Sequence, residues 1–67
     1  MPTKQKERGL LLRRARRILD VTQERLAARV GVSQAQIARF EAGTATPTPG
    51  QAKRLAKALH IAMEVLR

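Results

Sequence analysis

Apolar side chains recur at helical spacing along most of the chain and divide it into short amphipathic segments. The clearest segment is Gln23 to Val30, where Leu26, Ala27 and Val30 fall on one face of about two helical turns. Gly31 follows the last apolar position, and a glycine there ends a helix because it adopts left-handed backbone geometry without a Cβ clash. This pattern predicts a short helix followed by a tight turn.

A second short helix is predicted from Gln34 to Ala42, capped by the hydroxyl of Ser33. Opposite its apolar residues lie two small and two long polar side chains, with Gln36 at the border. These four are Gln34, Ala35, Ala38 and Arg39. Small residues permit close approach to a surface, and Gln and Arg can form paired hydrogen bonds with adenine and guanine edges. The pattern is therefore typical of a recognition helix in a DNA major groove.

The residues before these helices predict one longer helix and a basic leader. Leu10 to Leu19 has helical periodicity, with an inward stripe on one face. That stripe contains Leu12, Ala15 and one or both of Ile18 and Leu19. Four arginines occupy the other faces, and apart from Arg16 we expect most of them to be solvated. Met1 to Gly9 lacks an apolar stripe, so it is expected to be a basic flexible arm or a frayed helix start, with phosphate or minor-groove contact as its functional alternative.

The residues after the second short helix predict a loop and two further helices. Gly, Thr and Pro cluster at 43–49, which favours a loop. The run TPGQ at 48–51 predicts a helix start, with a threonine cap, proline at the first helical position and glutamine placed for the reciprocal bond. This helix should extend to about Leu59 with an inward face of Ala52, Leu55, Ala56 and Leu59. Residues 61–67 (IAMEVLR) predict a short fifth helix that closes an all-α core.

Several of these residues together resemble a known family. Gln23 at the helix start, Ala27 four residues on, Gly31 in the turn, Ile37 and the run ARFEAG resemble the helix-turn-helix of the phage repressor and Cro family. The rest of the chain, from about residue 10 to 66, also resembles that domain. The resemblance implies a compact five-helix repressor-like DNA-binding domain at 10–67, with the helix-turn-helix formed by its second and third helices.

The same resemblance implies roles for individual residues. Gln23 would contact the DNA backbone and brace Gln34, and Arg16 would form a structural ion pair with Glu41. Further candidates for backbone contact or support are Ser33, Gln36, Thr44 and Thr46. The loop departs from the family pattern because it carries threonine and alanine where relatives often carry Lys or Arg. Hydroxyls and backbone amides can still bind phosphate.

Composition narrows the class of partner. The 67 residues suit one domain, and 14 Lys and Arg against 5 Asp and Glu give a net charge of +9, which favours a polyanion. The chain has no cysteine and one histidine, so we expect no disulfide, metal or cofactor. Paired carboxylates, nucleophilic triads and glycine-rich phosphate loops are also missing, so we do not expect an enzyme. Without a membrane-spanning run or a signal segment, the sequence predicts a cytoplasmic protein that does not enter membranes.

Three functions stay open at this level. The leading one is sequence-specific binding to double-stranded DNA as a transcriptional regulator, with a homodimer on a palindromic site as an open question. The alternative is a protein-interaction module, such as an antitoxin-like subunit or a subunit of a larger regulator. LLLRRARRIL motivates a third, a cationic helix acting on membranes. The regular caps and Ala-, Arg- and Leu-rich helices fit an engineered domain as well as a natural one.

Overall fold

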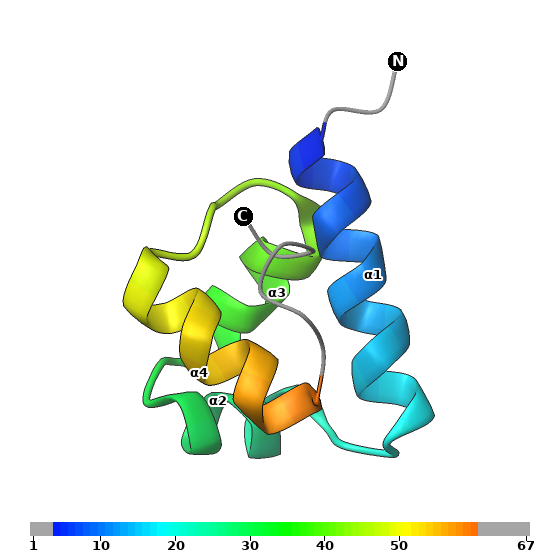
Figure 1. The fold of residues 1–67 in the computed structure, drawn as a ribbon, viewed down its shortest axis with the longest axis vertical. Coiled ribbons are helices and arrows are strands. Elements are labelled where there is room, and N and C mark those ends of the chain that lie inside the picture. The colour runs from blue at the N-terminus through cyan, green and yellow to red at the C-terminus, as the bar shows by residue number, and fades with distance from the viewer. Residues whose placement is uncertain (1–3, 61–67) are drawn as a thin grey trace.

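A computed structural model describes residues 4–60, and its regular structure is entirely helical. The elements are α1 (Lys4–Ile18), α2 (Gln23–Val30), α3 (Gln34–Ala42) and α4 (Pro49–Leu59). In this part of the chain there is no strand, which confirms the all-α class. The predicted fifth helix at 61–67 lies outside the described residues. Figure 1 shows α1 along one side of the molecule and α4 on the other, with α3 between them and α2 packed against both α3 and α4.

Polar caps define where three of the helices begin. The hydroxyls of Thr22 and Ser33 accept hydrogen bonds from the third backbone N–H after each of them, both at 3.1 Å. Thr48 and Gln51 form the predicted reciprocal pair at 3.2 and 3.0 Å, with Pro49 at the start of α4. Each such cap contributes about 1 kcal/mol. The predicted starts of α2, α3 and α4 are confirmed. They could be predicted because each cap involves residues only three positions apart.

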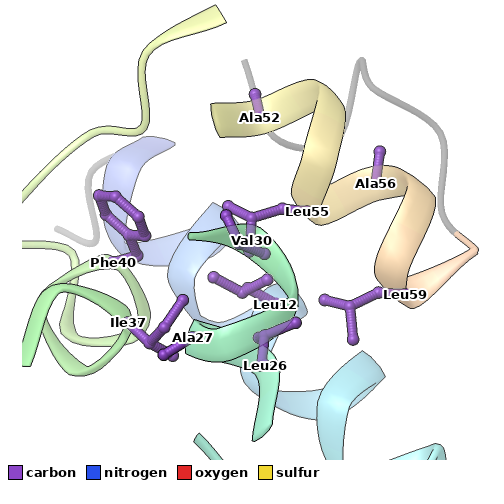
Figure 2. Close-up of a cluster of buried hydrophobic side chains, with 10 residues drawn as sticks. All are labelled: Leu12, Leu26, Ala27, Val30, Ile37, Phe40, Ala52, Leu55, Ala56 and Leu59. Carbon is purple, nitrogen blue, oxygen red and sulfur yellow. The ribbon is translucent and has the colours of Figure 1, made fainter. Parts of the chain in front are cut away.

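The core draws side chains from all four helices, as Figure 2 shows around Leu12. Its buried residues are Leu12, Leu26, Ala27, Val30, Ile37, Phe40, Ala52, Leu55, Ala56 and Leu59. The inward face predicted for α4 is confirmed. Within α3 only Ile37 and Phe40 are buried, so two side chains anchor this helix and its opposite face is available for contacts outside the domain.

The first helix begins at Lys4, so residues 4–9 are helical, in keeping with the predicted alternative of a helix start before Leu10 and not with a flexible arm. This part of α1 packs through a glycine, which hydrophobic periodicity does not register. Gly9 is buried, and a Cβ placed on it would lie 2.5 Å from the carbonyl oxygens of Phe40 and Glu41. The backbone of α1 therefore lies directly against the last turn of α3. The close approach continues one turn earlier in α1, at Lys6, whose Cα would lie 2.8 Å from a Cβ placed on Gly43 at the end of α3.

The predicted inward stripe is wrong at the end of α1. Ile18 is 82% exposed and Leu19 is 41% exposed, so neither belongs to the core of the described residues. The position one turn beyond buried Leu12 is taken by Arg16, whose guanidinium is held by an ion pair. A polar contact thus replaces an apolar one where the first helix meets the third.

Candidate nucleic-acid interface

The residues expected to read bases lie on the side of α3 away from the core. Gln34, Ala35 and Arg39 are exposed. Ala38 is half-buried because it lies beside α1, where it lines a cleft between the two helices. Gln36 is also half-buried, and its backbone N–H donates to the hydroxyl of Ser33, which caps the helix. The structure therefore presents three of the four predicted base-reading side chains openly and places the fourth at the border of this surface.

An ion pair joins α1 to the end of α3. The Arg16 Nε donates to Glu41 Oε2 at 2.6 Å, and its Nη2 donates to Glu41 Oε1 at 3.1 Å. This is the parallel two-bond geometry in which arginine and carboxylate bind most strongly. The third guanidinium nitrogen, Nη1, donates to the Val21 carbonyl at 2.9 Å. With the two side chains 12% and 5% exposed, the pair is largely shielded from water and fixes α1, the turn before α2 and α3 relative to one another.

The same carboxylate extends the network to the exposed face of α3, which carries Gln34. Gln23 Nε2 donates to Glu41 Oε1 at 3.2 Å, and Gln34 Nε2 donates to Gln23 Oε1 at 3.5 Å. The last bond is long, yet it leaves one amide proton and the carbonyl oxygen of Gln34 unused. Gln23 thus connects the buried ion pair to an exposed side chain on α3, as the sequence resemblance implied.

The hydroxyl residues differ in what they can still bind. Ser33 Oγ accepts the capping bond from Gln36, so its own proton remains available to an acceptor. Thr44 has no such freedom, because both its hydroxyl and its backbone N–H donate to the Arg39 carbonyl, at 3.3 and 3.0 Å. Thr46 is exposed in the loop that follows. Of the two loop threonines, Thr46 is therefore the better placed to donate to an anion.

A polar cleft of about 390 Å³ lies between α1 and α3. Its lining consists of Arg13, Arg16, Arg17, Gln23, Ala38, Glu41 and Ala42. The sequence pattern did not single out Arg13, Arg17 or Ala42. For Ala42 a signal existed, because it follows Ala35 by seven residues, close to two helical turns. The two arginines carry no local signal that separates them from other surface arginines.

A second basic cleft lies elsewhere, between α2 and α4, and is lined by Arg29, Arg54, Lys57 and Ala58. Across residues 4–60 no helix is long and apolar enough to cross a membrane. In the same range no three His, Cys, Asp or Glu side chains gather in a way that could hold a metal ion.

Comparisons with known proteins agree with the arrangement of α2 and α3 as a helix-turn-helix. The family model described as helix-turn-helix matches residues 12–66. Among solved structures, the chain is similar to the restriction-modification controller protein C.AhdI from Aeromonas hydrophila, with 27% sequence identity and a TM-score of 0.84. The similarity covers 92% of this chain and 94% of the controller protein. No curated protein sequence matches the chain.

Proposed function

Because the chain belongs to the helix-turn-helix family of phage repressor and Cro type, we propose that it regulates transcription by reading a specific double-stranded DNA sequence with α3. DNA-binding regulation is the function that the family and the similarity to a controller protein support. The observation that carries the finer proposal is the exposed face of α3, where Gln34 and Arg39 flank small residues. Such a face can approach base edges closely and still present paired hydrogen-bonding groups to them.

Each residue on this surface takes a distinct role in the proposal. Arg39 binds guanine O6 and N7, and Gln34 binds adenine through its remaining amide proton and its carbonyl oxygen. Ala35 and Ala38 allow close approach or touch a thymine methyl group. Around them, Gln23 at the start of α2 and Ser33 at the start of α3 contact phosphates, where free N–H groups also point outward.

Replacing Arg39 with alanine is expected to relax the preference at one base pair by about 1 to 3 kcal/mol, because a paired contact to guanine is lost. The measurement is selection from a randomised duplex library, followed by titration of the enriched duplex and of its single-base variants. Arg29→Ala is the matched control, since Arg29 is an exposed arginine of α2 that lines the other basic cleft. An unchanged enriched motif in the Arg39 variant would count against base reading by this residue.

A protein-interaction module, such as an antitoxin-like subunit or a subunit of a larger regulator, is the second candidate, and self-association into a homodimer is its simplest form. The observation in its favour is a set of exposed apolar side chains on and just after α1, namely Leu10, Leu11, Ile18 and Leu19. Sedimentation at several protein concentrations tests self-association. A monomer throughout, combined with a non-palindromic enriched motif, would leave the homodimer without support.

A further inference from the structure

We propose that Arg13 and Arg17 of α1 form a clamp for DNA phosphate, so that the backbone of one strand lies across the mouth of the cleft between α1 and α3. This inference rests on the proposed function, since it assumes that α3 enters the major groove. It adds a binding surface on a helix that is not part of the helix-turn-helix.

The clamp residues share one edge of α1. Arg13 and Arg17 are four positions apart, which places them on the same side of the helix one turn apart. Both side chains are exposed, and both line the cleft whose opposite wall includes Ala38 and Ala42 of α3. The contact at Gly9 holds this edge of α1 close to α3. The small side chains of Ala38 and Ala42 leave room in the cleft for a phosphate group.

The charges of the cleft are unbalanced toward the positive. Glu41 is the acidic residue in its lining, and its oxygens already accept from Arg16 and Gln23. The side chains of Arg13 and Arg17 make no hydrogen bond or ion pair with any of residues 4–60. Two like charges one helical turn apart destabilise a helix by a few tenths of a kcal/mol. An anion placed between them would remove that repulsion.

The position of the cleft identifies the anion. A helix lying in the major groove is flanked by the phosphates of both strands, and contacts to them set its orientation. Ala38 and Ala42 belong both to the cleft lining and to the outward side of α3, so a strand running alongside the inserted helix passes the cleft. The basic cleft formed by Arg29, Arg54 and Lys57 lies between α2 and α4 and borders no residue of α3. It therefore supplies a control with the same kind of charge.

The test compares two double variants that each remove two positive charges. Arg13→Gln with Arg17→Gln removes the clamp, and Arg54→Gln with Lys57→Gln is the control. Binding is titrated between 50 and 200 mM salt on the duplex enriched by the unaltered protein and on a scrambled duplex. Circular dichroism and thermal unfolding of each variant establish that it is folded.

We expect the clamp variant to bind both duplexes more weakly and its salt dependence to be shallower. Each phosphate contact contributes about 0.9 to the slope of log affinity against log salt, so the slope should fall by about 2. Over the stated salt range, the unaltered protein should lose about tenfold more affinity than the clamp variant. The enriched motif should stay the same, because phosphates carry no base identity. Arg13→Lys with Arg17→Lys, which keeps both charges, should retain the steep slope.

Two outcomes separate failure of the clamp from failure of the proposed function. Equal slopes for the clamp and control variants, with the enriched motif intact, would overturn the clamp and leave base reading by α3 standing. The other outcome is that the unaltered protein enriches no motif, while the salt slope on the scrambled duplex is shallower for the clamp variant than for the control. That result would overturn sequence-specific regulation and support the phosphate site.

Discussion

Replacing Glu41 with glutamine is expected to lower the free energy of unfolding by about 3 kcal/mol. The change leaves the Arg16 guanidinium, 12% exposed, without a neutralising partner, and such a loss typically costs about 3 to 5 kcal/mol. Residual contact of Arg16 with water favours the lower figure. A domain of this length has a total stability of about 3 to 10 kcal/mol, so one substitution can remove much of it. Urea unfolding followed by circular dichroism measures the difference.

The control for this prediction removes both charges together. Arg16→Met with Glu41→Leu should cost less than Glu41→Gln alone, because neither variant residue leaves a buried charge without a partner. The single variant should also bind DNA with less discrimination at the base pair that the proposed function assigns to Gln34, since Gln23 loses a charged acceptor. If the free energy of unfolding of the Glu41→Gln variant is within about 0.5 kcal/mol of the value for the unaltered protein, the ion pair does not hold α1 and α3 together.

Replacing Gly9 with alanine is expected to destabilise the domain by about 2 kcal/mol. Its new methyl group would lie 2.5 Å from two carbonyl oxygens of α3, so the helices must separate, and overpacking of this kind costs about 3 kcal/mol. Alanine's better helix propensity returns about 1 kcal/mol. The matched control is Gly50→Ala in α4, where a Cβ would meet nothing within 4 Å and stability should rise by up to about 1 kcal/mol.

Thermal and urea unfolding of the two alanine variants should therefore shift in opposite directions. If both variants were destabilised, the loss would come from replacing a helical glycine in general and not from the contact between α1 and α3. Unchanged stability of the Gly9 variant would mean that α1 can move away from α3 at little cost.

The helix-turn-helix could be predicted closely from sequence because local chemistry sets its boundaries. Ser33 caps α3 through a bond to a residue three positions away, and Gly31 ends α2 with a φ of 81°. The start of α4 follows from the bonds between Thr48 and Gln51 in the same way. Interactions over three or four residues are contained in the sequence itself, so no knowledge of the tertiary structure was needed.

The features that the sequence did not reveal depend on contacts between distant segments. The packing of Gly9 against α3 spans about thirty residues and involves no side chain that hydrophobic periodicity could detect. Ile18 is exposed, and the contact between α1 and the end of α3 at that level is made by the Arg16–Glu41 pair, which periodicity does not give. Arg13 and Arg17 likewise differ from other arginines only because α3 lies beside them. The spacing of apolar residues predicts which face of a helix is buried, whereas the segment that packs against that face is known only from the three-dimensional structure.

The division of α3 into an anchored face and an open face makes this domain suitable for retargeting. Ala35, Arg39 and Ala42 are exposed, and their side chains form no hydrogen bond within residues 4–60, so substitutions there other than Gly and Pro should change stability by less than about 1 kcal/mol. Gln34 is different, because its amide is tied through Gln23 to Glu41. A library randomised at 35 and 39 would therefore vary the proposed base contacts on a constant scaffold, whereas randomising 42 would also change the cleft beside α1, and randomising 34 would disturb the hydrogen bonds that connect α3 to Glu41.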